Sequence, residues 1–380
     1  MKFLLIYVPN LRFSYKGDWS KRKLNEICLF FKGNGLSKSD LSNEGFPCIL
    51  YGELYTTYKN EVISDIISKT NTTLSNPFLS KNNDLIIPGS GEDPIDIAVA
   101  RAIYQNDIIL GGDLNILRPK SNVSAAFLSY QLNGVRRYDI AKKAQGKSIV
   151  HLHNSDLKEV LVSIPSYDEQ LHIVKLLTKI DEMIETQSKI IDDYNSLKMG
   201  IYNCMFKENY ADYKLKQLAY IVKGDQINND QLLSNGSYYM MNGGASPSGY
   251  LDSYNVSENT ISISEGGNSC GYVQFNSSPF WSGGHCYTIQ NVNSALIENK
   301  YLYHYLKYKE KEIMNLRIGT GLPNIQKKDL ENFTILVPSL LIQRKNLALF
   351  EMLDEKISIL NEELANLQKQ KKYLLCNMFI

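Results

Sequence analysis

Apolar residues recur at a helical spacing through a long segment, from Asp168 to Phe206. They stand at Ile173, Leu177, Ile180, Ile184, Ile191, Tyr194, Ile201 and Met205, separated by three, four or their sums. This is the pattern of a helix with one apolar seam. Pro165 and Ser166 precede the segment and mark a helix start. At about 1.5 Å per residue the helix would extend nearly 60 Å, too long to fill one small domain, so its stripe predicts a partner.

The stretch from Leu340 to Ile380 repeats the first at a constant shift of 173 in residue number. The shift pairs Pro165 with Pro338, Gln170 with Gln343, Leu177 with Phe350, Ile180 with Leu353, Asp181 with Asp354, Ile184 with Ile357, Met205 with Met378 and Phe206 with Phe379. It also pairs Gly146 with Gly319, well upstream of both predicted helices. Because the match continues through non-periodic Ile-Pro-Ser and Val-Pro-Ser segments, it indicates an internal repeat and not merely two amphipathic helices.

The remainder of the chain predicts two α+β regions. Residues 11–163 contain short strands punctuated by Gly and Pro, such as Asp84 to Pro88 and Ile149 to Leu152, and a helix at Ala125 to Leu132. In residues 213–336, the opening Lys214 to Gly224 resembles Lys23 to Gly33 at a shift of 191, whereas the interiors diverge. We assign a first domain to 1–163, a helical spacer to 164–208, a second domain to 209–336 and a second spacer to 337–380.

Two helices of equal length in such a chain can pack antiparallel along their seams. They would then relate two similar domains by an approximate two-fold axis within one chain. Duplex DNA with two half-sites has that kind of symmetry. Since the interiors of the two domains differ, the half-sites need not have the same sequence.

Composition restricts the protein class. The chain has 380 residues, 43% hydrophobic and 21% charged, with no apolar run long enough to span a bilayer and no recognisable signal peptide. Its six cysteines form no Cys-x-x-Cys, which indicates reduced thiols in a cytoplasm. A zinc site built from His151, His153 or the His285-Cys286 pair is not favoured, because no ligand spacing recurs. A net charge of +1 means that any nucleic-acid surface must be a local patch.

No set of catalytic residues emerges. Gly146-Lys147-Ser148 resembles the end of a P-loop, but Ala141 stands where its first glycine is required. Asn76-Pro77-Phe78 resembles the signature of amino-methylating DNA methyltransferases but lacks the second proline. The glycine pairs Gly243-Gly244, Gly266-Gly267 and Gly283-Gly284 are typical of tight turns with positive φ, and loops that approach DNA are the alternative.

Basic and amide residues near turns are the candidates for DNA contact, because they bind phosphates and read base edges. The candidates are Arg136, Arg137, Lys142, Lys143, Gln145 and Lys147 in the first domain, and Asn242, Arg317, Thr320, Asn324, Lys327 and Lys328 in the second. Solvated lysines and hydrogen-bonded turn asparagines are the alternatives. We therefore base the prediction on the clusters and not on single residues.

Short motifs occur in a fixed order along the chain: Val8-Pro9-Asn10-Leu11-Arg12-Phe13 with Trp19, Tyr51-Gly52-Glu53-Leu54-Tyr55-Thr56, Gly111-Gly112-Asp113-Leu114, Ile164-Pro165 with Glu169-Gln170 through Met205-Phe206, Asn242-Gly243-Gly244 with Pro247-Ser248-Gly249-Tyr250, and Gly319-Thr320-Gly321-Leu322-Pro323-Asn324-Ile325. In these motifs the chain resembles the specificity subunits of type I restriction-modification systems, over nearly its whole length. The second spacer departs from the family pattern, since Ile342-Gln343 replaces Glu169-Gln170. That difference is expected to alter one contact and not the helix.

The resemblance implies a non-catalytic subunit that reads double-stranded DNA. It also implies two modification (methyltransferase) subunits as partners, two restriction subunits in the full complex, and target adenines flipped into a partner's site. S-adenosylmethionine, ATP and Mg²⁺ would belong to those partners, and no metal to this chain. A two-domain protein-binding scaffold with a helical spacer is the alternative, and an enzyme in its own right is a third hypothesis.

Overall fold

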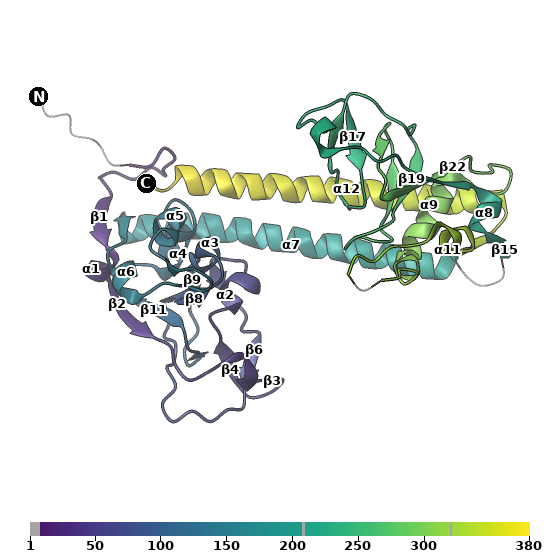
Figure 1. The fold of residues 1–380 in the computed structure, drawn as a ribbon. Helices are drawn as coiled ribbons and strands as arrows, with labels where there is room; N and C mark the ends of the chain where they lie inside the picture. The colour runs from purple at the N-terminus through teal and green to yellow at the C-terminus, as the bar shows by residue number, and fades with distance from the viewer. Residues whose placement is uncertain (1–7, 207–209, 320) are drawn as a thin grey trace, which may run out of the picture. The chain divides into compact units, whose positions relative to one another are not determined.

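A computed structural model describes residues 8–206, 210–319 and 321–380 (Figure 1). The chain divides into two compact units. The first comprises the residues up to Ser188 together with Glu362–Ile380, and the second comprises Lys189–Asn361. Each unit therefore contains one globular domain and a segment of each long helix.

The two predicted long helices are confirmed. They are α7 (Tyr167–Met205) and α12 (Leu340–Asn377). The helix α12 ends earlier than the stretch to Ile380 predicted from the sequence. Met378 and Phe379 follow the helix, and both are buried in an apolar cluster with Trp19 and Phe127 of the first domain.

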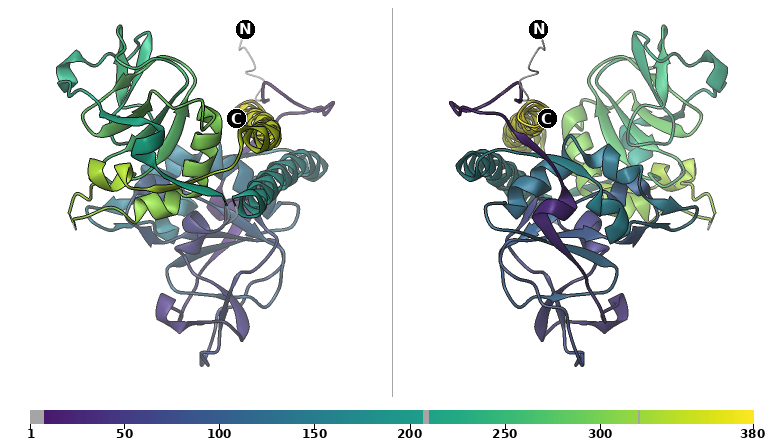
Figure 2. Two further views of the ribbon diagram at one scale, coloured as in Figure 1. Left: turned by 90° about the vertical axis from the view of Figure 1, so that its right-hand side faces the viewer. Right: turned by 90° about the vertical axis from the view of Figure 1, so that its left-hand side faces the viewer.

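The two helices pair antiparallel in each unit, as predicted. In the first unit Lys371 of α12 contacts Asp181 of α7, and Gln187 donates a hydrogen bond to Glu363. In the second unit Lys198 of α7 contacts Asp354 of α12. Figure 2, which looks along the helices, shows the two ribbons side by side. Predicted seam residues such as Ile173, Leu177 and Ile180 are buried, which accounts for the spacing of apolar residues.

The first domain is built on a five-stranded mixed sheet with the order β2-β11-β7-β9-β5. These strands are β2 (Cys28–Lys32), β11 (Leu114–Pro119), β7 (Asp84–Pro88), β9 (Arg101–Ile103) and β5 (Val62–Ile63). The helix α4 (Ala125–Asn133) packs against β9 and β7, and its residues from Ala125 to Leu132 are all buried. The predicted strand at Asp84 to Pro88 and helix at Ala125 to Leu132 are therefore confirmed.

Smaller elements complete the first domain. Three further sheets have the orders β10-β4-β6-β3, β12-β13-β8 and β1-β14. Their strands are β10 (Ile109–Leu110), β4 (Phe46–Ile49), β6 (Ser68–Thr70), β3 (Leu41–Ser42), β12 (Gln145–Gly146), β13 (Val150–His151), β8 (Ser90–Gly91), β1 (Ser20–Lys23) and β14 (Leu161–Ile164). The short helices are α1 (Leu24–Ile27), η1 (Lys38–Asp40), α2 (Glu53–Thr56), α3 (Pro94–Ile97), α5 (Arg137–Ala141) and α6 (Asn154–Lys158).

The second domain has sheets with the orders β16-β22-β19-β20, β18-β17-β21 and β15-β23. Their strands are β16 (Tyr220–Lys223), β22 (Cys286–Gln290), β19 (Thr260–Ser264), β20 (Val273–Asn276), β18 (Gly249–Leu251), β17 (Tyr238–Met241), β21 (Trp281–Ser282), β15 (Ala211–Lys214) and β23 (Thr334–Val337). The helices are α8 (Leu215–Leu218), η2 (Asn229–Gln231), α9 (Asn299–Tyr308), α10 (Glu310–Met314) and α11 (Lys327–Glu331). Helices and strands are thus mixed in both domains, as the α+β prediction requires.

A buried glutamine joins each long helix to its domain. The Gln170 side-chain carbonyl accepts a hydrogen bond from the Ser124 backbone, and its amide donates to Asn122 and Pro165. Gln343 repeats this arrangement with the backbone of Glu298, Leu296 and Pro338. Because Ser124 and Glu298 are the N-caps of α4 and α9, each glutamine connects the start of a long helix to the start of a domain helix.

The Glu169 to Ile342 difference between the repeats changes a specific contact, as expected. Glu169 accepts hydrogen bonds from Arg12 and from the Trp19 indole at 2.7 and 3.2 Å. Ile342 cannot accept such bonds and is 38% exposed. The helix itself is unchanged, because α12 begins at Leu340, two residues before Ile342, and α7 begins at Tyr167, two residues before Glu169.

Candidate nucleic-acid interface

Both domains bring three central strands together in the same way. In the first domain Lys32 at the end of β2 pairs with Asn115 of β11, and Leu114 pairs with Pro88 of β7. In the second domain Lys223 at the end of β16 pairs with Tyr287 of β22, and Cys286 pairs with Ser264 of β19. The two strand ends are therefore equivalent positions of the repeat, although the surrounding sequences differ.

A later segment pairs with this strand end in each domain. In the first domain His151 pairs with Gln145 and with Ser90, and the Leu152 amide donates to the Gly89 carbonyl at 2.9 Å. These contacts recur in the second domain at the repeat shift of 173. Asn324 bridges Ile318 and Gly266, and the Ile325 amide donates to the Glu265 carbonyl at 2.9 Å. The shift read from the sequence therefore corresponds to equal backbone positions.

The matched glycines of this segment have a structural reason. Gly146 and Gly319 have φ of +137° and +98°, a region that favours glycine. A Cβ on Gly146 would lie 2.0 Å from the carbonyl oxygen of Ile149. Glycine is therefore required there by the turn, whatever the segment binds.

The glycine pairs differ in backbone conformation. Gly243 and Gly267 have positive φ, as predicted for turns. Gly283 and Gly284 do not, and they lie against the ends of neighbouring side chains. An added Cβ would lie 2.6 Å from the Met240 side chain at Gly283, and 2.3 Å from the Gln226 side chain at Gly284.

The candidates of the first domain separate into two groups. Gln145 and Lys147 are exposed beside the β12–β13 turn, and Lys142 and Lys143 lie shortly before it, after α5. The two arginines are engaged inside the first unit. Arg136 donates to the Ile380 carbonyl at 2.9 Å, and Arg137 donates to the Ile95 carbonyl at 3.1 Å. Their guanidinium groups thus have structural partners, and their DNA contact stays a prediction.

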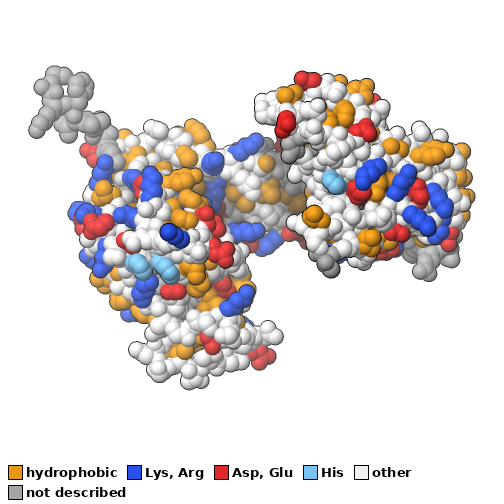
Figure 3. All heavy atoms as spheres, in the orientation of Figure 1, with side chains coloured by type: hydrophobic (Ala, Val, Ile, Leu, Met, Phe, Trp, Pro, Cys, Tyr) orange, Lys and Arg blue, Asp and Glu red, His pale blue; other side chains and the backbone are white. Residues whose placement is uncertain are grey.

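Most candidates of the second domain gather near Asn324. Arg317 and Asn324 are exposed, and Lys327 and Lys328 are exposed at the start of α11. Thr320 lies outside the described residues. Asn242 comes from a different segment, after β17, and its side-chain oxygen accepts a hydrogen bond from the His285 amide at 2.9 Å. Figure 3 shows Lys and Arg side chains gathered on one face of this domain, consistent with a local basic patch.

A cavity of about 500 Å³ lies at the strand end of the second domain. Its lining includes Lys223, Asn242, Glu265, His285, Pro323 and Asn324. Glu265 is only 8% exposed. One carboxylate oxygen accepts hydrogen bonds from the Lys223 ammonium at 2.6 Å and the Tyr287 hydroxyl at 3.0 Å. The other has no hydrogen-bond partner, and the His285 Nδ1 lies 3.5 Å from it.

The environment of Glu265 keeps its partner Tyr287 protonated. Burial, followed by the hydrogen bond and charge of Glu265, raises the pKa of the Tyr287 hydroxyl. Tyr287 therefore remains a neutral donor to the carboxylate. His285 itself has a side chain that is 61% exposed, so a buried carboxylate lies behind an accessible imidazole.

Several residues of this site are absent from the sequence-based candidates. They are Lys32, Ser90, Asp113 and His151 in the first domain, and Lys223, Glu265 and His285 in the second. Two signals were available, because Lys32 matches Lys223 at the shift of 191 and His151 matches Asn324 at the shift of 173. No sequence signal connects Glu265 with His285, since their proximity depends on the pairing of β19 with β22.

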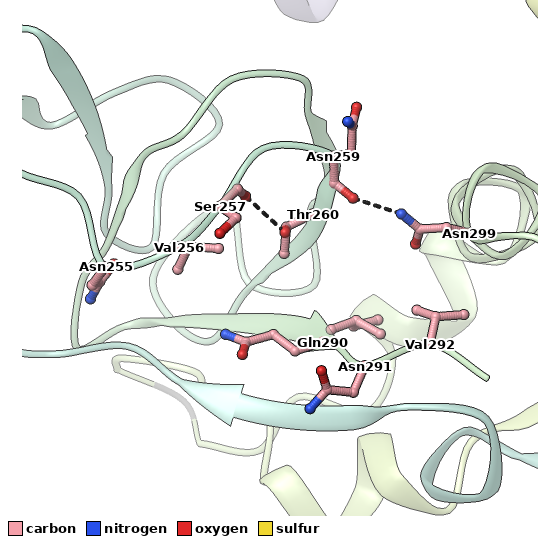
Figure 4. Close-up of a pocket in the computed structure, with 10 residues that line it drawn as sticks. Asn255, Val256, Ser257, Asn259, Thr260, Gln290, Asn291, Val292 and Asn299 are labelled. Atoms are coloured by element: carbon pink, nitrogen blue, oxygen red, sulfur yellow. Dashed lines mark hydrogen bonds between the residues drawn. The ribbon is translucent and has the colours of Figure 1, made fainter. Parts of the chain in front are cut away.

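A second cavity, of about 410 Å³, has a lining rich in side-chain amides (Figure 4). Asn255 hydrogen-bonds with the backbone of Ser282, and Asn299 donates to the Asn259 carbonyl at 2.6 Å. Asn259 and Asn291 have φ of +58° and +50°, which asparagine tolerates well. Because Asn259 and Asn291 shape turns at the end of β19 remote from Glu265, and Asn255 holds the backbone of β21, we assign these amides a structural role.

Three further features concern membrane-spanning helices, metal ligands and cysteines in the described part of the chain. None of its helices is long and apolar enough to cross a membrane. Within the same residues, no group of three or more His, Cys, Asp or Glu side chains is arranged to hold a metal ion. All six cysteines are free, and burial raises the pKa of Cys28 to about 12 and of Cys286 to about 11. Those two thiols are therefore unreactive at neutral pH.

Comparison with known proteins identifies the family. The profile of the type I restriction modification DNA specificity domain matches the chain twice, at residues 16–193 and 207–369. A protein of Methanocaldococcus jannaschii named as a type I restriction enzyme specificity subunit is 23% identical, covering 94% of this chain and 92% of that protein. A protein of Mycoplasma pneumoniae named as a type I specificity subunit is 34% identical, but the alignment covers 40% of this chain and 41% of that relative.

Solved structures share the fold. The S subunit of a type I restriction-modification system from M. genitalium matches with a TM-score of 0.70 and 20% identity, over 98% of this chain and 99% of that one. A chain from a study of complex assembly in a type I system matches with a TM-score of 0.56 and 16% identity, over 94% and 96%. With two matching specificity domains, the repeated frame and the antiparallel helices, the chain belongs to the non-catalytic specificity subunits of type I restriction-modification systems.

Proposed function

We propose that each globular domain reads one half of a bipartite, asymmetric site in double-stranded DNA. The observation that carries the proposal is the repeated strand end. Its backbone pairing is the same in both domains, whereas the side chains on it differ. The shared backbone arrangement would place both domains against one duplex in the same way, and the different side chains would recognise two different half-sites.

The two long helices would set the distance between the half-sites. The helix α7 contains 39 residues, which at about 1.5 Å per residue gives roughly 58 Å. That length exceeds the roughly 34 Å of one DNA turn, so base pairs between the half-sites can remain unread.

The outer faces of the helices would dock two modification subunits and, in the full complex, two restriction subunits. Large apolar side chains are exposed on both helices: Met183, Leu197, Met199, Met352, Ile359 and Tyr373. Exposed apolar side chains of this kind are typical of protein-protein contacts. S-adenosylmethionine, ATP and Mg²⁺ would be held by those partners, and the complex would act on DNA in the cytoplasm.

Exchange of the first domain tests the proposal. Residues 11–163 would be replaced by the corresponding region of another family member, and the chain would be assembled with its methyltransferase partner. Selection from a randomised duplex library, followed by sequencing, should show one half-site changed and the other retained. A change in both half-sites would contradict the modular assignment. A wild-type complex that retains no duplex DNA at low salt would instead support the scaffold alternative.

A further inference from the structure

The repeated strand end carries different hydrogen-bonding side chains at equal backbone positions. Gly89 and Glu265 are equivalent, because each accepts the amide proton of the equivalent residues Leu152 and Ile325. His151 and Asn324 are equivalent as well. His151 pairs with Ser90, the residue after Gly89, and Asn324 pairs with Gly266, the residue after Glu265.

Asp113 and His285 form the third equivalent pair. Asp113 directly precedes Leu114, the residue of β11 that pairs with Pro88. His285 directly precedes Cys286, the residue of β22 that pairs with Ser264. Both side chains are exposed. One repeat position thus presents a carboxylate in one domain and an imidazole in the other.

Each exposed side chain is held by a polar neighbour. In the first domain the hydroxyl of Ser90, a residue that is 5% exposed, donates to the Asp113 carboxylate at 3.1 Å. In the second domain the nearly buried Glu265 carboxylate lies 3.5 Å behind the His285 ring, with one oxygen lacking a hydrogen-bond partner. The side-chain oxygen of Asn324 accepts a bond from Gln326 at 2.9 Å, which orients its amide.

We propose that these equivalent positions are the base-reading sites of the two domains. Asp113 and His151 would read the first half-site, and His285 and Asn324 the second, with Glu265 as the positioning residue for His285. This inference rests on the proposed function and assigns the residues that determine sequence within it. The residues that read bases would then lie at the strand ends and not in the lysine clusters, and the lysines would contact phosphates.

The chemistry of Asp113 makes a specific prediction about the DNA. A carboxylate only accepts hydrogen bonds, so it favours a base that presents an exocyclic amine in the major groove, namely cytosine or adenine. It disfavours guanine and thymine, which present carbonyl oxygens there. The base read by Asp113 should therefore be C or A.

Asp113→Asn is the critical variant, because asparagine tolerates the φ of +55° at this position and adds a donor. The matched control is Asp107→Asn, at an exposed aspartate of the same domain with φ of +64°. In the second domain Asn324→Ala is compared with Asn315→Ala, and Glu265→Gln tests the positioning of His285. Each chain is assembled with its methyltransferase partner and selected on a randomised duplex library.

For Asp113→Asn we expect discrimination at one base pair of the first half-site to fall roughly tenfold or more, with the second half-site unchanged. Asn324→Ala and Glu265→Gln should each relax positions in the second half-site only, and the two controls should leave the motif unchanged. If the wild type enriches a bipartite motif that Asp113→Asn and Asn324→Ala leave intact, the inference is wrong while the proposed function stands. If the wild type enriches no motif, the proposed function itself fails.

Discussion

Asp181 of α7 and Lys371 of α12 form an ion pair of 2.6 Å that has a counterpart in the second unit, with the partners exchanged between the helices. There Asp354 of α12 meets Lys198 of α7, and both residues are related to the first pair by the repeat shift of 173. The two pairs differ in their third neighbour. Lys371 also contacts Glu61 of the first domain at 2.6 Å, whereas Asp354 lies 3.9 Å from His304 of the second. The ion pair between the helices is thus the same in both repeats, whereas the side chain that each domain places beside it differs.

The exchange of Lys371 for methionine should be strongly destabilising. Glu61 and Asp181 have side chains that are 7% and 5% exposed, and removal of the ammonium leaves two carboxylates together in a buried site. Breaking a buried ion pair in this way costs about 3 kcal/mol or more. Unfolding in urea, followed by circular dichroism, measures the loss.

Lys198→Met is the matched variant, because Asp354 is 39% exposed and water can solvate it once the ammonium is removed. The expected cost is about 1 kcal/mol or less, after allowance for solvent screening. Equal losses in the two variants would show that burial of the carboxylates is not what distinguishes the two junctions.

Leucine in place of Gln170 or Gln343 should loosen the connection between a long helix and its domain. Each amide makes three hydrogen bonds to backbone groups, and leucine would leave those groups buried without partners. We expect a loss of about 2 kcal/mol or more in either variant. Hydrogen exchange should rise locally, at the start of α4 for Gln170→Leu and at the start of α9 for Gln343→Leu. Gln370→Leu, at an exposed position of α12, should leave exchange at both sites as in the wild type.

The second unit should lose stability in mild acid because of His304. Burial, followed by the charges of Lys198 and Lys300, lowers the pKa of His304 to about 3, whereas in the unfolded chain it would be near 6.5. Between these values the unfolded chain binds a proton that the folded chain does not, so the free energy of unfolding falls as pH falls. The expected loss is about 2 kcal/mol between pH 7 and pH 5.

Glutamine is a suitable replacement, since it is neutral over this pH range and can still form hydrogen bonds. His304→Gln should remove most of the pH dependence between pH 7 and pH 5 in urea denaturation. His172→Gln, at an exposed position of α7, should retain it. A wild-type unfolding free energy that is flat over this range would show that folding does not lower the pKa of His304.

The lysines near the β12–β13 turn should affect DNA affinity and not its sequence preference. Lys142 and Lys147 are exposed, and removing one phosphate contact lowers the slope of log affinity against log salt by about 0.9. The double variant to glutamine should reduce the slope by roughly 1 to 2 and preserve the motif. Lys38→Gln with Lys69→Gln removes the same charge from other exposed positions of that domain and should leave the slope unchanged. If the two double variants change the slope equally, net charge and not this cluster governs the affinity.

A paired deletion should shorten the unread spacer of the DNA site. Removal of residues 188–191 from α7 together with 361–364 from α12 takes about one turn from both helices, in the region where Gln187 meets Glu363. The antiparallel contacts can then re-form, and the helices shorten by about 6 Å, equivalent to one or two base pairs of roughly 3.4 Å. Library selection should return both half-sites unchanged and closer together. An unaltered spacer would show that the helices do not set it.

The sequence by itself determined the frame of this protein. The seam from Ile173 to Met205 and its copy at the shift of 173 predict two helices that need each other, because a single apolar stripe is stable in water only when it is covered. The repeat also equates Gly146 with Gly319 and Gln170 with Gln343, which the structure explains by a positive φ and by shared hydrogen bonds. Periodicity and repetition are local or linear properties, so they can be read without a fold.

Tertiary structure alone decided which side chains share a site. Glu265 and His285 are 20 residues apart in a stretch without repeat or periodicity, and the pairing of β19 with β22 brings them together. Arg136 and Arg137 are of the residue type that contacts DNA, yet they donate to the carbonyls of Ile380 and Ile95. Whether a charged group faces solvent or a backbone carbonyl depends on packing between distant segments, and the spacing of residues along the chain does not encode it.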